Sequence, residues 1–395
     1  MGHLLTGKSS LIPLIDRLNR YPIGLVDTPR LREILALLFD PREAEVAARF
    51  PLTEATLDEL SQRTGVPPEE LDGILESMAN KGLVMDLTVS HRTYYLLVPG
   101  LIGFMEFSFM RDRGDLPQAE LARLMSDYLR ERGKDGQAGE FFGGRWPLTR
   151  ALVYEDRIPV ESRVTQWEDA RQIIRDAEFH AVTKCFCRHK KEHEGKACQQ
   201  GAPVDDICMV LGQGARFLVR RGMAEQRSET EMLAILDRAR ELGLTHITDN
   251  IRERPSFLCN CCRCCCELLA GVQIGFHDGI GKTRFLAEID PNLCDYCGDC
   301  LAACNAKCIG LATAARNKPK QQRWAQVDPA ICLGCAACLD ACKRDALRLV
   351  PRPQHRRPPR DRNQLFARIL WDKGRLLPYV TEGLRRGFGR LRRRP

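Results

Sequence analysis

The chain has 395 residues, of which 44% are hydrophobic, and this length and composition allow two or three domains with buried cores. The formal net charge of +8 is unevenly placed, because residues 351–395 hold 13 Arg and one Lys against three acidic residues and so carry +11, whereas residues 1–350 carry about −3. Nineteen cysteines without a predicted export signal exclude a disulfide-stapled secreted domain and favour metal binding.

Two apolar segments are too short to act as a signal peptide or a membrane span. LIPLI near the N-terminus is followed at once by Asp16 and Arg17. The longest apolar stretch, residues 94–105, is broken by Pro99 and Gly100. We therefore expect a cytoplasmic protein, and the mixture of helical and strand-like segments predicts a multidomain α+β fold.

The first predicted domain covers residues 1–100, with short helices followed by a hairpin over residues 28–98. Apolar residues at helical spacing between Pro68 and Gly82 predict a helix, and LVMDLTVSHRTYYLLV after it predicts two strands. The stretch TLDELSQRTGVPPEELDGILESMANKGLV, in this element order, resembles many winged-helix domains. That resemblance implies either DNA binding or a protein-interaction role.

Charge argues against DNA as the partner of this domain. The helix that would enter the major groove has a single lysine, Lys81, against four acidic residues: Glu69, Glu70, Asp72 and Glu76. Lys and Arg supply most of the affinity for phosphates, so this helix would repel DNA. A protein-interaction or structural role is the favoured interpretation, and nucleic acid is not an expected partner.

Residues 101–182 are predicted to be a helical connector without a catalytic constellation, and residues 183–284 a mixed helical, cysteine-rich central domain. A capping box of Ser228 and Glu231, followed by an apolar stripe and Gly243, predicts a helix over residues 228–242 of the central domain.

The first four cysteines of the central domain predict a third iron–sulfur cluster. They follow the pattern C-x-C-x10-C-x9-C and are Cys185, Cys187, Cys198 and Cys208. Zinc usually takes cysteine pairs spaced C-x2–4-C, whereas the two sulfurs of C-x-C can bind different irons, so zinc is the less favoured alternative. The basic run that begins at Arg188 either places positive charge beside the cluster or forms a solvated loop.

Six further cysteines crowd into the eight residues CNCCRCCC. No fold needs so many thiols for packing, and clustered thiols in a reducing cytosol favour metal. We expect at least some of them to bind metal, with their partition and the metal identity open: Cys259, Cys261, Cys262, Cys264, Cys265 and Cys266.

The last predicted domain, residues 285–350, contains the same motif twice. IDPNLCDYCGDCLAACNAKCIGL and VDPAICLGCAACLDACKRDALRL both carry C-x2-C-x2-C-x3-C. This spacing supplies three thiolates from one tight turn and a fourth from further along the chain, as a [4Fe–4S] cluster requires. The two copies contain Cys294, Cys297, Cys300, Cys304, Cys332, Cys335, Cys338 and Cys342.

This segment resembles a bacterial-type two-cluster ferredoxin, in which the fourth Cys of each run ligates the other cluster. The resemblance implies two [4Fe–4S] clusters, one held by Cys294, Cys297, Cys300 and Cys342, the other by Cys332, Cys335, Cys338 and Cys304. The Pro that usually follows each fourth Cys is replaced by Asn305 and Lys343. Cys308 is a ninth thiol, expected to be a small buried residue rather than a ligand.

A wider resemblance covers about residues 150–350. The strings CFCRH, CMVLGQGARFLVRRG, GLTH and CNCCRCCC ahead of the duplicated motif look like a group of prokaryotic 4Fe–4S dicluster-domain proteins. The resemblance implies iron–sulfur binding and electron transfer, with no substrate and no ligand partition for the central cysteines.

The basic segment 351–395 is predicted to be a Pro/Arg linker followed by an amphipathic tail. PRPQHRRPPRDRN is not expected to pack a core. Val380, Leu384, Phe388 and Leu391 then recur at helical spacing among arginines, as in a helix that contacts an anionic membrane surface or an acidic partner. Disorder is the alternative.

These features predict an iron–sulfur electron carrier or oxidoreductase subunit rather than a stand-alone enzyme. It would relay single electrons through two [4Fe–4S] clusters and a third metal centre. A flavoprotein or another oxidoreductase subunit is the expected redox partner, because no flavin or nucleotide loop is evident. Two alternatives stay open: a redox enzyme with an unusual cluster at residues 259–266, and a regulator whose cluster switches the winged helix on DNA.

Overall fold

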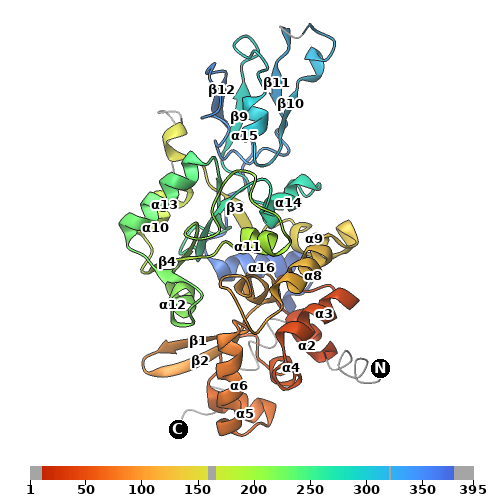
Figure 1. Cartoon of the computed structure of the whole chain (residues 1–395), viewed down its shortest axis with the longest axis vertical. Helices are drawn as coiled ribbons and strands as arrows, with labels where there is room; N and C mark the ends of the chain where they lie inside the picture. The colour runs from red at the N-terminus through yellow and green to blue at the C-terminus, as the bar shows by residue number, and fades with distance from the viewer. Residues whose placement is uncertain (1–10, 159–165, 320–321, 378–395) are drawn as a thin grey trace.

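The computed structural model describes residues 11–158, 166–319 and 322–377. Figure 1 shows three parts along the long axis: N-terminal helices with a hairpin at one end, a sheet with flanking helices in the middle, and the duplicated cysteine motif at the other end. Several small sheets among many helices agree with the predicted α+β class. Within the described residues, no helix combines the length and the apolar character needed to cross a bilayer.

The N-terminal part contains the helices and the hairpin that the sequence predicts. Asp40 and Thr56 form capping boxes with Glu43 and Glu59 and so fix two helix starts. The elements are α2 (Ile12–Leu18), α3 (Pro29–Leu38), α4 (Pro41–Ala48), α5 (Leu57–Thr64), α6 (Pro68–Asn80), β1 (Val84–Val89) and β2 (Arg92–Leu97), the last two pairing antiparallel. Membership of the winged-helix class stays a prediction.

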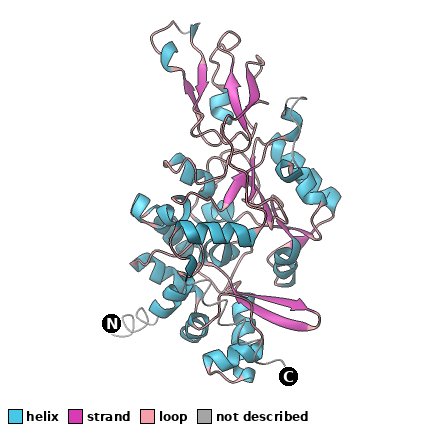
Figure 2. Cartoon of the chain, turned by 180° about the vertical axis from the view of Figure 1, so that it is seen from behind, coloured by secondary structure: helices cyan, strands magenta, loops and turns pink. Residues whose placement is uncertain are grey.

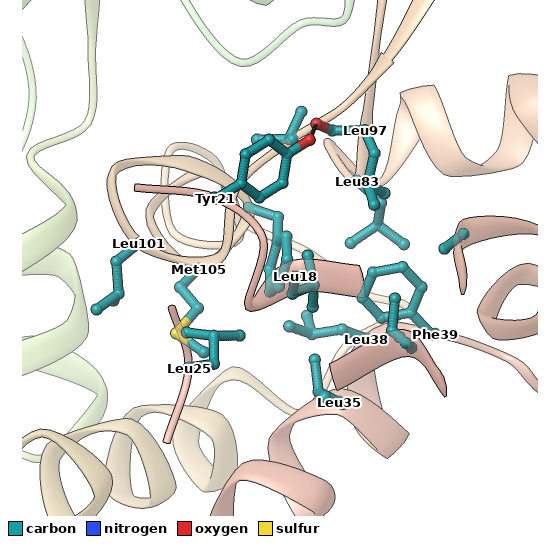
Figure 3. Packing of buried hydrophobic residues seen from close by; sticks show 14 of the residues in the cluster. Leu18, Tyr21, Leu25, Leu35, Leu38, Phe39, Leu83, Leu97, Leu101 and Met105 are labelled. Carbon is teal, nitrogen blue, oxygen red and sulfur yellow. Dashed lines mark hydrogen bonds between the residues drawn. The ribbon is translucent and has the colours of Figure 1, made fainter. Parts of the chain in front are cut away.

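One hydrophobic core joins this part to the helices that follow it. Most of its residues lie between Leu11 and Phe141, across the predicted domain boundary at residue 100, and later residues such as Phe186 and Leu365 also belong to it. Figure 3 shows part of its packing, in which the Tyr21 hydroxyl donates a hydrogen bond to the carbonyl oxygen of Leu97. The additional helices are α7 (Met105–Phe107), α8 (Gln118–Arg130) and α9 (Gln137–Phe142).

The central part is built on a six-stranded antiparallel sheet in the order β3-β7-β8-β5-β4-β6. Figure 2 shows its strands from behind, between the hairpin and the C-terminal part. Two strands, β3 and β4, precede residue 184, so the predicted connector contributes to this sheet. The strands are β3 (Thr149–Ala151), β4 (His180–Thr183), β5 (Cys208–Leu211), β6 (Glu225–Gln226), β7 (Thr245–Asp249) and β8 (Phe257–Cys261).

Short helices flank the sheet. The helix predicted from the Ser228 capping box is present and runs from Glu229 to Glu241. Arg221, just after α12, pairs with Glu76 of α6 at 2.6 Å and with Asp86 of β1 at 3.0 Å. These ion pairs hold α6 and the β1–β2 hairpin of the N-terminal part against the central part. The helices are α10 (Ala170–Arg175), α11 (Phe186–His193), α12 (Gly212–Arg220), α13 (Glu229–Glu241) and α14 (Glu267–Gln273).

In the C-terminal part, each copy of the motif lies between two strands that pair with strands of the other copy. The strand before the first copy, β9 (Phe285–Ile289), pairs with the strand after the second, β12 (Leu347–Pro351). In the same way, β10 (Ile309–Leu311) pairs with β11 (Ala325–Val327). Helix α15 (Asp299–Ala303) lies within the first copy.

The segment after β12 packs on the molecule, contrary to the expectation for a Pro/Arg linker. Pro358 and Pro359 are buried, and the backbone N–H of Arg252 donates to the Pro359 carbonyl oxygen at 3.0 Å. Helix α16 (Arg362–Asp372) then buries Leu365 and other apolar residues against the N-terminal core. Proline and arginine carry enough apolar surface to be covered once their backbone groups are paired. The predicted amphipathic residues from Val380 to Leu391 lie outside the described residues.

Candidate metal centres

The first set of thiols in the C-terminal part draws on both copies of the motif. Cys294, Cys297 and Cys300 come from the first copy and Cys342 from the second, and all four line one small cavity. Gly298 adopts a positive φ of 94° directly before α15, which turns the chain between two of these thiols. Cys297 is exposed to solvent. Four soft thiolate donors around one hollow fit iron, as predicted, and ligation itself stays a prediction.

The second set combines Cys304 of the first copy with Cys332, Cys335 and Cys338 of the second. Burial raises the pKa of Cys338 well above its ordinary value, and the neighbouring thiolates of Cys335, Cys304 and Cys332 add to the shift. Thiols this buried and this close cannot all ionise without a compensating cation, which a cluster would provide. Cys308 is buried, as predicted, with its Sγ 3.4 Å from that of Cys304.

The second set lies at the junction with the central sheet. The Thr245 hydroxyl, at the start of β7, donates to the Cys335 Sγ at 3.6 Å. Asn305 occupies one of the two positions where ferredoxins usually have Pro, and its side-chain amide donates to the Thr245 hydroxyl at 3.0 Å and to the Gly243 carbonyl oxygen at 2.7 Å. The departure from the ferredoxin pattern therefore provides an interdomain contact that the sequence did not reveal.

The family model described as the 4Fe-4S dicluster domain matches residues 293–346. Residues 293–346 form a 4Fe–4S dicluster domain. This confirms that the C-terminal part of the chain is a ferredoxin-type, iron–sulfur-binding domain. No curated protein and no solved structure matches the chain. The wider resemblance over residues 150–350 stays a prediction.

Outside the dicluster domain, six central thiols form a continuous series in which each thiol shifts the pKa of the next, called here the six-thiol group. Hydrogen bonds from the thiols of Cys208 and Cys261 lower the pKa of Cys259 to about 6, so the group offers a thiolate at neutral pH. The order along the chain of contacts is Cys185, Cys208, Cys259, Cys261, Cys266 and Cys187.

The central sheet explains this grouping. Cys208 begins β5 opposite Thr183, the last residue of β4, and Cys185 follows two residues later. Cys259 and Cys261 lie on neighbouring β8, where alternate side chains share one face. Three adjacent strands thus bring together thiols that are up to 76 residues apart in the sequence.

A buried arginine lies beside these thiols. Arg188 is 2% exposed, and its guanidinium donates to the Asn260 carbonyl oxygen at 2.8 Å and to the Pro203 carbonyl oxygen at 3.3 Å. Burial alone would lower the pKa of Arg188, but the charge that the nearby cysteines, led by Cys185, carry when ionised outweighs burial and raises it. Of the two predicted alternatives for this basic run, the structure shows positive charge beside the thiols.

A cavity of about 1090 Å³ adjoins the six-thiol group. All six thiols and Cys262 line it, and its other walls come from the N-terminal part, α12, α14 and α16. The lining is mostly apolar, with Leu101, Leu218 and Leu365 among its residues. Glu106 also lines it, and burial raises the pKa of this carboxyl group to about 7. The cavity exceeds the usual 300–1,000 Å³ of small-molecule sites, so it has room for an organic molecule beside the thiols.

The other four central thiols form a separate group, called here the four-thiol group. Its members are Cys198, Cys262, Cys264 and Cys265, whose sulfurs all lie within 4.8 Å of one another. The prediction placed Cys198 with Cys185, Cys187 and Cys208, whereas the structure joins Cys198 to the CNCCRCCC run and the other three to the six-thiol group. The difference arises because Cys198 lies in the loop after α11, away from the strand ends that position the other three.

Proposed function

We propose that this protein is an iron–sulfur electron-transfer protein in which the dicluster domain exchanges single electrons with a further iron–sulfur centre at the six-thiol group. One contact carries the proposal. Thr245 donates a hydrogen bond to Cys335 of the dicluster domain and is also the β-sheet partner of Cys261 in the six-thiol group. A single residue therefore links the two sets of thiols.

The clusters, when bound, supply one-electron redox chemistry at iron. The chain contributes ligands, burial and hydrogen bonds to sulfur. Cys332 and Cys338 are less than 9% exposed, so water is kept from the second set of dicluster thiols. Exposed Cys297 gives the first set a face toward solvent. A flavoprotein or another oxidoreductase subunit would dock at that outer face and supply two-electron chemistry.

Iron counting tests this proposal. Anaerobically purified full-length protein is expected to contain more iron and sulfide than the roughly eight irons of two [4Fe–4S] clusters. EPR of the dithionite-reduced protein is expected to show more reduced centres than a two-cluster domain provides. Eight irons or fewer at full occupancy of the dicluster domain would refute a cluster at the six-thiol group.

A second candidate function is a redox enzyme that uses the six-thiol group as its reaction centre. The cavity favours it, because an electron carrier needs no large apolar chamber beside its cluster ligands. A suitable reaction is the reduction of an organic disulfide, in which two electrons from the reduced protein and two protons convert RSSR to two RSH. Glu106 is the cavity carboxyl group suited to hold a proton near neutral pH.

Two matched glycine variants distinguish the enzyme from the carrier. A Cβ at Gly214 of α12, which lines the cavity, would contact nothing within 4 Å, and the same holds for exposed Gly73 of α6. We expect Gly214→Trp to slow the oxidation of reduced protein by an aromatic disulfide, and Gly73→Trp to leave the rate unchanged. Equal rates in both variants would leave the carrier as the better assignment.

The DNA-binding alternative gains no support from the interactions of α6. Glu76 of this helix is engaged by Arg221 of the central part, and the helix keeps its acidic face. Duplex binding that depends on salt and on the redox state would restore the regulator interpretation.

A further inference from the structure

The four-thiol group differs in spacing from the other sets of cysteines. The Cys264 Sγ lies 3.7 Å from the Cys198 Sγ and 3.6 Å from the Cys265 Sγ. Among the described residues, it is the sole group of cysteines in which four sulfurs all lie within 4.8 Å of one another. The eight dicluster thiols, which belong to a domain that binds iron–sulfur clusters, are not packed in this way.

We propose that the four-thiol group binds one Zn²⁺ ion in a tetrahedral site. With Zn–S bonds of about 2.3 Å, the edges of a regular S₄ tetrahedron measure about 3.8 Å, close to the two observed separations. In a [4Fe–4S] cluster each thiolate binds a different iron, so the cluster itself holds the four sulfurs much further apart. The spacing thus fits a single ion and leaves no space for a cubane.

The surrounding backbone supports a closed structural site. The Gln199 backbone N–H donates to the Cys264 Sγ at 3.3 Å. The Arg263 backbone N–H donates in turn to the Gln200 side-chain oxygen at 2.8 Å. Four protein thiolates leave no open position on the ion, as in structural rather than catalytic zinc sites.

The ion would join the loop after α11 to the turn between β8 and α14, across 66 residues of sequence. This turn lies between Cys261 and Cys266, both members of the six-thiol group. Zinc has no redox chemistry, so the site would hold the shape of the neighbouring centre without carrying electrons. The inference is independent of the proposed electron transfer, because zinc and iron are counted separately.

Metal analysis of three full-length proteins tests the proposal. Wild-type protein, made anaerobically in medium with iron and zinc, is expected to contain one zinc per chain in addition to its iron. Cys264→Ser is expected to lose the zinc and keep the dicluster iron and its EPR signal. Cys297→Ser, a matched control in the dicluster domain, is expected to lose iron and keep the zinc.

Two outcomes would overturn the proposal: wild-type protein without zinc, or a Cys264→Ser variant that loses iron and sulfide in cluster proportion while zinc is unchanged. Cobalt substitution in the wild-type chain gives a measurement that does not depend on folding of the variant. One Co²⁺ in place of zinc is expected to show tetrahedral absorption with thiolate-to-cobalt charge transfer. Octahedral absorption without charge transfer would also refute the site.

Discussion

The dicluster domain and the central part gather their thiols in different ways. In the dicluster domain, each set takes three thiols from one C-x2-C-x2-C turn and the fourth from the other copy of the motif. In the central part, the sheet brings Cys185, Cys208 and Cys259 together from three strands or strand ends, and neighbouring cysteines of one run go to different groups. Local spacing therefore determines the first arrangement, and tertiary structure determines the second.

The first prediction removes one ligand from each kind of arrangement. Cys259→Ser is expected to abolish the centre at the six-thiol group, with loss of all iron beyond the roughly eight of the dicluster domain. Cys297→Ser is expected to lose one dicluster cluster and to keep the central iron. Iron and sulfide analysis with EPR of the reduced proteins measures both changes.

Loss of the dicluster iron in Cys259→Ser would contradict separate arrangements, because the two regions would then form one cooperative metal-binding unit. Cys308→Ser serves as a control in either case. Cys308 is buried beside Cys304 but belongs to neither predicted ligand set, so the iron count is expected to stay the same.

The sequence predicted what local patterns determine. The hairpin at Val84–Leu97, the capped helix after Ser228 and the duplicated cysteine motif follow from periodicity, capping and spacing, whereas the crossed pairing of the two dicluster thiol sets was implied by the ferredoxin resemblance. The six-stranded sheet was not predicted, because its strands are only two to five residues long and two of them carry cysteines in place of β-branched residues. Without the sheet, Cys198 could not be separated from its neighbours in sequence.

The second prediction concerns the cavity that adjoins the six-thiol group. Burial raises the pKa of Glu106 from 4.5 to about 7. Between these two pH values, Glu106 is therefore mostly protonated in the folded protein and mostly ionised in the unfolded chain. The contribution of Glu106 to the free energy of unfolding is therefore fully present below pH 4.5. It falls by roughly 3 kcal/mol as the pH rises to about 7.

Glu106→Gln is expected to remove this pH dependence. The variant should be more stable than wild type by roughly 3 kcal/mol at pH 8 and similar to it near pH 4.5, because glutamine has no proton to lose and can still accept the hydrogen bond of the Gly103 backbone N–H. Anaerobic urea unfolding across this pH range measures the difference. Glu120→Gln, at an exposed site on α8, controls for the loss of a carboxylate. Equal effects of the two substitutions would contradict the assignment of this pH dependence to the raised pKa of Glu106.

The third prediction compares the two residues that replace the usual Pro of the ferredoxin pattern. Asn305 is 1% exposed and makes two hydrogen bonds to the central part, whereas the Lys343 side chain is 87% exposed. Asn305→Ala is expected to lower the free energy of unfolding by about 1–3 kcal/mol, because buried partners lose their donor. Lys343→Ala is expected to change it by less than about 0.5 kcal/mol. Equal losses in denaturant titrations would show that the junction does not depend on Asn305.

The substitution with the smallest expected effect is at Thr245, the residue that joins the central part to the dicluster domain. Thr245→Val keeps the shape of the side chain and removes both the hydrogen bond to the Cys335 sulfur and the acceptor of the Asn305 amide. A hydrogen bond to a ligand sulfur favours the reduced, more negative cluster, so its loss is expected to lower one potential by some tens of millivolts, or roughly 1 kcal/mol or less for one electron. In a redox titration followed by EPR, the midpoint of the cluster bound by the second set should fall, and that of the cluster bound by Cys294, Cys297, Cys300 and Cys342 should stay constant. Equal shifts of both midpoints would mean that Thr245 acts on the domain as a whole, and no shift would mean that the contact with Cys335 has no effect on the cluster.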